Sequence, residues 1–152
     1  MTTNTLTGEY FYNIDSKGRL NIPAKYRNAL APENNNTFII TKGQDPCIYA
    51  YPLIEWGKVE SELRNLSSAS LKNRSFIRTM VRFAVPVKFD KQGRIQLTPA
   101  LMEYASLDKE VLIIGVVNKI EIWNPIKLDQ LEKNELKIDS QEYETLAEKI
   151  IL

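Results

Sequence analysis

The stretch DSKGRLNIPA at residues 15–24 recurs in altered form as DKQGRIQLTPA at residues 90–100. Both copies contain an Asp, a Gly followed directly by an Arg, and a closing Pro-Ala pair, and their apolar positions match. A repeat of this kind usually marks one supersecondary unit that is used twice around a shared core. The repeat therefore predicts a chain built from two related units.

Each copy predicts a strand, a tight turn and a second strand. Asp15 and Asp90 suit the first position of a type I turn, and Gly18 and Gly93 suit the left-handed position that closes a hairpin with a bulge. Apolar residues alternate on both sides of the turn, as in half-buried strands. A short helix near the Pro-Ala pair and two more strand-like segments complete each unit, so that the fold class is α+β with two ββαββ units.

Two segments of different character flank the second unit. Residues 55–82 have apolar residues at helical spacing, and they separate a first unit at 7–54 from a second at 83–126. Residues 127–152 form a net acidic tail with a capping-box pattern, which predicts a terminal helix. In the connector, Arg74, Arg78 and Arg82 would line one helical face, as a phosphate-binding surface or as an ordinary solvated one.

The composition excludes several classes of chemistry. The chain has 152 residues, no His and a single Cys, so that His-dependent triads, zinc clusters and intrachain disulfides are excluded. No Walker or Rossmann glycine pattern occurs, so we expect no cofactor and no small-molecule substrate. No apolar run reaches the ~20 residues that span a bilayer, and no signal-peptide pattern is present, so we expect a cytoplasmic protein without a membrane partner. An enzyme is the least expected class.

The residues resemble those of the MraZ family of bacterial transcriptional regulators, which contain two SpoVT/AbrB-like domains. The resemblance rests on the two Asp-x-x-Gly-Arg turns, on Tyr51-Pro52-Leu53 with Trp56, and on the segment 118–123 after the second unit. It implies a swapped-hairpin β-barrel with flanking helices and subunits assembled into a ring. It also implies a nucleoid-associated protein that binds repeated DNA boxes upstream of its own operon of division and cell-wall genes.

The family's DNA-contacting motif, Asp-x-x-x-Arg, falls on Asp15/Arg19 and on Asp90/Arg94. The residues themselves agree, because an Arg after a tight turn on the solvent face of a hairpin can reach a phosphate or a guanine edge. Lys17 and Lys91 add charge at the turns, although they occupy different turn positions. These four basic residues are the expected DNA contacts, and the expected turn-forming residues are Asp15, Gly18, Asp90 and Gly93.

Other interpretations of the same residues remain open. The two aspartates would serve mainly as turn residues, and Arg19 and Arg94 could form ion pairs with them instead of contacting DNA. The net charge of +1 is low for a purely electrostatic DNA binder, so repeated subunits on repeated boxes would have to supply affinity. The alternative function is a protein-interaction or assembly scaffold without specific DNA binding.

Overall fold

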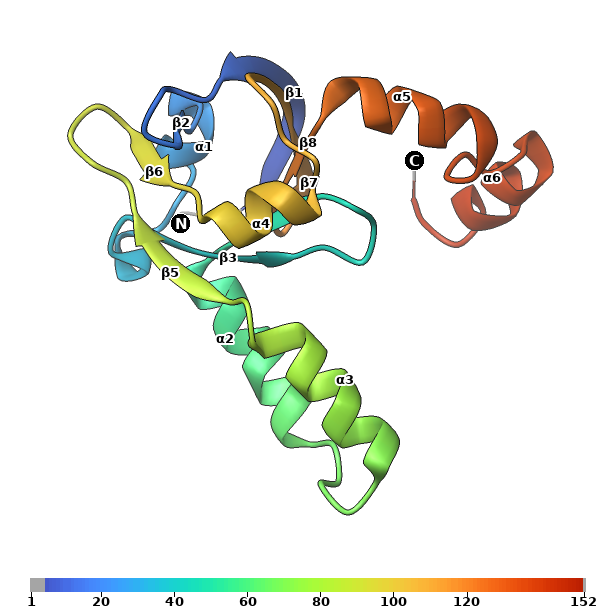
Figure 1. Ribbon diagram of the computed structural model, residues 1–152. Helices are drawn as coiled ribbons and strands as arrows, with labels where there is room; N and C mark the ends of the chain where they lie inside the picture. Colours follow the sequence, from blue (N-terminus) through green and yellow to red (C-terminus); the bar gives the residue numbers. More distant parts are fainter. Residues whose placement is uncertain (1–4, 152) are drawn as a thin grey trace.

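The computed structural model describes residues 5–151, which form eight strands, six α-helices and one short 3-10 helix (Figure 1). This confirms the α+β class. The first unit contains β1 (Leu6–Asn13), β2 (Arg19–Asn21), α1 (Ala24–Asn28), η1 (Pro32–Asn34), β3 (Thr37–Lys42) and β4 (Ile48–Pro52). The second contains β5 (Val85–Lys88), β6 (Arg94–Gln96), α4 (Pro99–Tyr104), β7 (Glu110–Val117) and β8 (Ile120–Trp123). Between the units lie α2 (Leu53–Arg64) and α3 (Leu71–Val81), and after them come α5 (Pro125–Asn134) and α6 (Ser140–Ala147).

The strands of the two units interleave. Six strands form one antiparallel sheet in the order β1-β7-β8-β4-β3-β5, and β2 pairs with β6 in a separate two-stranded ribbon. The first strand of each unit therefore bonds to a strand of the other unit: β1 lies against β7, and β5 lies against β3. The register of β1 on β7 runs from Leu6 opposite Val117 to Asn13 opposite Glu110. Because of this exchange, the two units share one hydrophobic core.

Two details of the predicted hairpins and barrel are corrected. In each unit only the turn itself is closed by hydrogen bonds, where the backbone N–H of Asp15 donates to the carbonyl of Arg19 at 3.0 Å. Beyond this point the strands separate, and the N–H of Ile14 donates to the carbonyl of Lys109 in the other unit. No closed barrel is found in residues 5–151, because β2 and β6 pair with each other and leave β1 and β5 as the edges of the larger sheet.

Alternation along the strands divides the core between the two faces of the sheet. One face packs against the ribbon and the helices α1 and α4, with Leu20 and Ile95 of the ribbon at most 1% exposed. The other face packs against α2 and α5, around Trp56 and the almost fully buried Trp123. Buried residues on both faces explain the nearly continuous apolar sequence of β3, β4 and β7.

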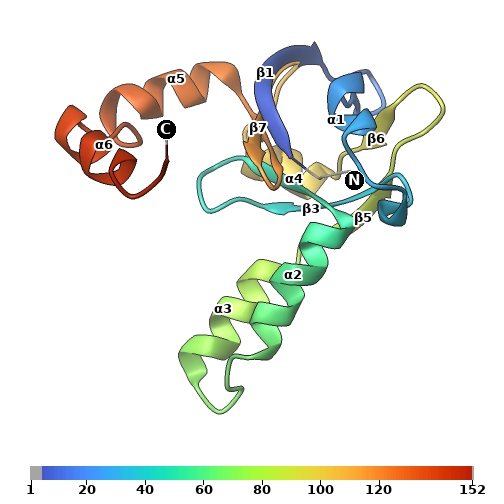
Figure 2. The same cartoon turned by 180° about the vertical axis from the view of Figure 1, so that it is seen from behind.

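Two helical extensions leave this core in different directions. The hairpin of α2 and α3 projects from the end of the sheet, whereas α5 and α6 extend from another side, as both views show (Figures 1 and 2). Side-chain caps start four of the helices: Ser70 caps α3, Thr98 caps α4, Asn124 caps α5, and Asp139 caps α6 by accepting from the N–H of Glu142 at 2.8 Å. None of the described helices is long and apolar enough to cross a bilayer.

Candidate nucleic-acid interface

The β2–β6 ribbon brings the two repeated turns side by side. Its register places Leu20 opposite Ile95, Arg19 opposite Gln96, and Asn21 opposite Arg94. Because Leu20 and Ile95 point into the core, the polar residues beside them point outward. Arg19 and Arg94 are thus diagonal neighbours on one face, and such positions are about 7–8 Å apart between Cα atoms. The sequence-predicted arginines therefore share one surface.

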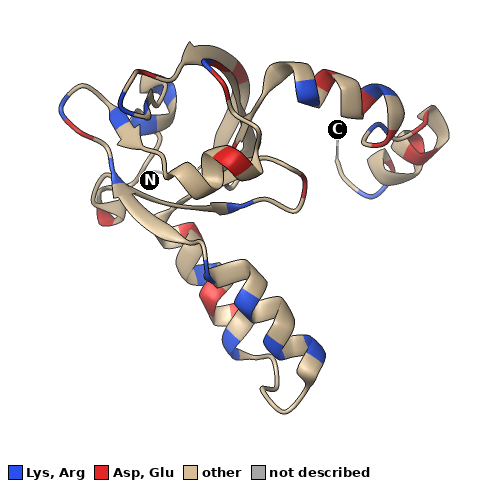
Figure 3. Cartoon of the chain, viewed as in Figure 1, with Lys and Arg blue, Asp and Glu red and all other residues tan. Residues whose placement is uncertain are grey.

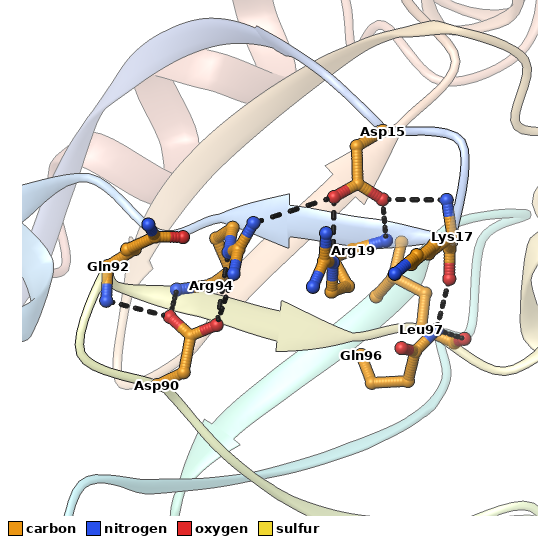
Figure 4. A network of polar contacts seen from close by, with 8 residues as sticks. All are labelled: Asp15, Lys17, Arg19, Asp90, Gln92, Arg94, Gln96 and Leu97. Carbon is orange, nitrogen blue, oxygen red and sulfur yellow. Dashed lines mark hydrogen bonds and ion pairs between the residues drawn. The ribbon is translucent and has the colours of Figure 1, made fainter.

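In the first turn, Asp15 holds both the backbone and the arginine. Its Oδ1 accepts the backbone N–H groups of Lys17 and Arg19, each at 2.9 Å, and its Oδ2 accepts Nε of Arg19 at 2.7 Å (Figure 4). Gly18 has a φ of 77°, in the left-handed region that favours glycine. The aspartate therefore fixes the turn and the direction of the guanidinium group together.

The second turn repeats this arrangement. Oδ1 of Asp90 accepts the N–H groups of Gln92 and Arg94 at 2.9 and 3.0 Å. Oδ2 of Asp90 lies 3.0 Å from both Nε and Nη2 of Arg94, and Gly93 has a φ of 81°. The ion pairs left open as an alternative are thus present in both turns. The side chains of Arg19 and Arg94 nevertheless remain 30% and 26% exposed.

Asp15 also connects the two turns, and this breaks their symmetry. Its Oδ2 lies 3.8 Å from Nη1 of Arg94, whereas no ion pair between Arg19 and Asp90 is formed in the part of the chain that the structure describes. Arg94 is therefore held by two carboxylates. Within residues 5–151 the Nη atoms of Arg19 make no hydrogen bond to another residue. The Nη edge of its guanidinium group is therefore freer to bind a ligand than that of Arg94.

The hydrogen bonds stabilise the charged form of both aspartates and lower their pKa values. The backbone N–H of Arg19, followed by its guanidinium and the N–H of Lys17, lowers the pKa of Asp15 to about 2. The backbone N–H and side chain of Arg94 lower the pKa of Asp90 in the same way. Asp15 borders an open hollow of about 520 Å³ together with Asp108. A carboxyl group with this pKa is unsuited to act as a general acid at neutral pH.

Two amides that the sequence reasoning missed brace the turns across the units. Nε2 of Gln96 donates to the carbonyl of Lys17 at 2.8 Å. With its amide nitrogen facing the second turn, Asn21 donates to the carbonyls of Gln92 and Gly93 at 2.9 and 3.1 Å. Each residue therefore supports the turn of the other unit. The sequence shows only that these two residues hold equivalent positions, two residues after each arginine, on the outward side of their strands.

Arg27 is a further basic residue at this surface that the sequence reasoning missed. It extends from α1 across Gly93, where Nε donates to the carbonyl of Ile22 at 2.9 Å and the guanidinium lies 5.9 Å from the ring centre of Phe89. The equivalent position after the second Pro-Ala pair is Glu103. Only the second turn therefore has an arginine of this kind beside it.

The remaining predicted basic residues lie in two places. Lys17 and Lys91 are exposed at the tips of the turns, next to the arginines. Arg74 and Arg78 lie on the projecting α3, and Arg82 directly follows this helix, which lies away from the ribbon in both views (Figures 1, 2 and 3). The structure therefore brings the four expected contacts together and leaves these three arginines outside this surface.

The described residues offer no metal-binding cluster of His, Cys, Asp or Glu. Cys47 is fully buried, and burial raises the pKa of its thiol. What the surface offers is two oriented guanidinium groups, two exposed ammonium groups and exposed backbone turns. Groups of this kind bind phosphates and the acceptor-rich edges of bases.

Comparison with known proteins gives consistent similarities. The model of the family described as "MraZ protein, putative antitoxin-like" matches twice, at residues 5–79 and 80–149. Three curated relatives carry the name "Transcriptional regulator MraZ". The protein from Halothermothrix orenii is 47% identical over 117 residues, covering 77% of this chain and 79% of the relative. Those from Pediococcus pentosaceus and Moorella thermoacetica are each 41% identical, over 145 and 144 residues, covering 95% of both chains in each pair.

Proposed function

The chain belongs to the MraZ family, and on that premise we propose that it is a transcriptional regulator that binds double-stranded DNA through the outward face of the β2–β6 ribbon. The curated relatives carry the name of a transcriptional regulator and not of an enzyme. The observation that carries the proposal is the pairing of two Asp-x-x-x-Arg turns on one surface, each with its arginine oriented by an aspartate.

The chemistry of the arginines supports base reading as well as phosphate binding. A guanidinium group recognises guanine by donating two parallel hydrogen bonds to O6 and N7 in the major groove. In Arg19, Asp15 occupies Nε and leaves the Nη edge for such a contact. In Arg94 the edge is shared with Asp90 and Asp15, so we expect Arg94 to contribute less. Lys17 and Lys91 would bind the flanking phosphates, which position the protein without reading sequence.

The low net charge supports binding by several subunits at once. One chain of net charge +1 provides few phosphate contacts, and therefore little non-specific affinity. A ring of subunits on repeated boxes would raise the affinity through effective concentration. We therefore include in the proposal a homo-oligomeric ring that binds repeated boxes upstream of its own division and cell-wall operon, in the cytoplasm and at the nucleoid.

The proposal keeps the division into a DNA-binding unit at 7–54, a helical connector at 55–82, a second DNA-binding unit at 83–126 and a helical tail at 127–152. The exchange of β1 and β5 between the units supports the swapped-hairpin arrangement, without closure of a barrel. Because the first strand of each unit pairs with a strand of the other unit, we expect a single unit to be unstable by itself.

The test is a mobility-shift titration of the protein on its own upstream DNA and on a scrambled duplex, at several salt concentrations. We expect Arg19→Ala to weaken specific binding by about 1–3 kcal/mol, with a smaller loss for Arg94→Ala. The control is Lys72→Ala, which removes an exposed positive charge from α3, away from the ribbon. Equal binding of wild type to both duplexes would refute the proposal and favour an interaction scaffold.

A further inference from the structure

The terminal helix α6 presents an uncovered apolar face. None of the residues of α6 (Ser140–Ala147) is buried, and the side chains of Tyr143, Leu146 and Ile150 are 62%, 53% and 63% exposed. Together with Ile138 and Ala147 they line a hollow of about 270 Å³. A helix this short is marginal in water by itself, because most helical stability comes from packing of the apolar face. We therefore expect this apolar face to pack against another protein surface.

A second apolar hollow lies at the far end of the molecule, between α2 and α3. It has a volume of about 400 Å³, and its apolar lining consists of Leu63, Leu66, Ile77 and Val81. None of the residues of α3 (Leu71–Val81) is buried. We call this surface the hairpin groove. Its lining residues on α3, Ile77 and Val81, are four positions apart, which is about one helical turn.

The charges beside the two surfaces are opposite. At 100° per residue, Arg74 and Arg78 lie beside Ile77 and Val81 on α3. From α2 the groove is lined by Arg64 and by one acidic residue, Glu60, so basic residues outnumber acidic ones around it. On α6, Glu142 and Glu144 border the two sides of the apolar stripe. The map of charged residues shows basic residues on α3 and acidic residues on α6 (Figure 3). Like surfaces would repel each other, whereas unlike surfaces attract.

We propose that α6 of one copy of this chain docks in the hairpin groove of a second copy. The occupant follows from two complementarities, apolar stripe to apolar groove and acidic border to basic border. The inference rests on the proposed homo-oligomer, and it names the surfaces through which the copies contact each other. These surfaces lie outside the β2–β6 ribbon, so that docking leaves the DNA-binding face free.

The contact is between copies because α5 holds α6 away from its own groove. Leu128 of α5 is only 9% exposed and packs in the cluster around Trp123 on the sheet. From this anchor the arm of α5 and α6 extends away from α2 and α3 in both views (Figures 1 and 2). A contact between two different surfaces repeats from copy to copy, and it closes into a ring or continues as a filament.

Chemical cross-linking of the full chain tests the contact directly. Cys47 is fully buried, so engineered thiols are the reactive ones in the folded protein. A chain carrying both Arg78→Cys and Glu142→Cys should give a ladder of covalent multimers with a short bismaleimide. The matched control carries Lys72→Cys with Glu142→Cys, because Lys72 lies on the opposite side of α3 from the groove. An equal ladder in the control, or no ladder in the test chain, would overturn the proposal.

Charge exchange gives a second, independent readout. Reversal of Arg74 and Arg78 to Glu, or of Glu142 and Glu144 to Arg, should weaken assembly by about tenfold or more in sedimentation equilibrium. Combining the two reversals should restore assembly, and failure to restore it would count against docking. Binding of the same variants to a duplex with one box separates the two proposals. Assembly governed by these charges without any specific DNA binding would refute only the proposed function.

Discussion

Replacement of Gly93 by Ala tests whether the packing of Arg27 makes a side chain at Gly93 more destabilising than one at Gly18. Gly93 has a φ of 81°, and a Cβ there would lie 2.6 Å from Nε and 2.7 Å from Cζ of Arg27. Gly18 has a similar φ of 77°, but its Cβ would meet only Nε2 of Gln96 closely, at 3.0 Å. The two glycines therefore share the same backbone demand and differ in their surroundings.

The expected cost follows from these two terms. The left-handed region costs a non-glycine residue about 1–2 kcal/mol, and the stiffer unfolded chain offsets about 0.4–1 kcal/mol. Gly18→Ala should thus lower the free energy of unfolding by about 1 kcal/mol. Gly93→Ala must also displace Arg27 and break its 2.9 Å hydrogen bond to the carbonyl of Ile22, which adds about 1 kcal/mol.

Thermal unfolding at equal protein concentration measures the difference. For a chain of this size the melting temperature should fall by about 2–4 °C in Gly18→Ala and by about 4–8 °C in Gly93→Ala. In an Arg27→Ala background, the added Gly93→Ala substitution should cost only the backbone term, about 1 kcal/mol. Equal losses for the two glycine substitutions in the wild-type background would refute this reasoning.

Three further predictions concern single groups. The pKa of Asp15 is about 2 in the folded protein, below its ordinary value of 3.8, so Asp15 stabilises the fold above pH 3.8 and loses this effect as the pH falls toward 2. The melting temperatures of wild type and Asp15→Asn should therefore converge at low pH, and a constant difference would contradict the pairing. Tyr26 is fully buried and donates to the carbonyl of Gly8 at 2.6 Å; Tyr26→Phe should lower the free energy of unfolding by about 1–2 kcal/mol in denaturant titrations, and an unchanged value would argue against this bond. Cys47 should react slowly with a thiol reagent in the native protein and rapidly after unfolding, because burial raises its pKa; equal rates would contradict its position.

Local patterns predicted the elements, whereas the partners of the strands required the structure. The alternation around Leu20 and Ile95 indicates strands, and the Asp and Gly positions indicate turns, because both features depend on neighbours in the sequence. The pairing of β1 with β7 joins residues about a hundred positions apart, and no local pattern carries that information. The sequence therefore suggested hairpins within each unit, where the structure has exchanged strands.

The candidate site was predictable to a similar extent. Arg19 and Arg94 could be identified from the repeat, but their closeness depends on the β2–β6 register. The brace formed by Gln96 and the packing of Arg27 on Gly93 both cross between the units, so neither could be recognised before the strand exchange was known. The shared carboxylate of Asp15, which makes the two arginines unequal, arises from the same exchange.

The central claim is that the two arginines read DNA as oriented, planar groups and not merely as positive charges. The most direct test is a comparison of wild type with the double substitution Arg19→Lys and Arg94→Lys, which keeps both charges but removes the bidentate geometry. Fluorescence anisotropy would measure the affinity for the protein's own upstream box and for a scrambled duplex at one salt concentration. The account predicts that the affinity for the box falls by at least about tenfold while the affinity for the scrambled duplex is nearly unchanged. Unchanged affinity for the box in the double variant would contradict it.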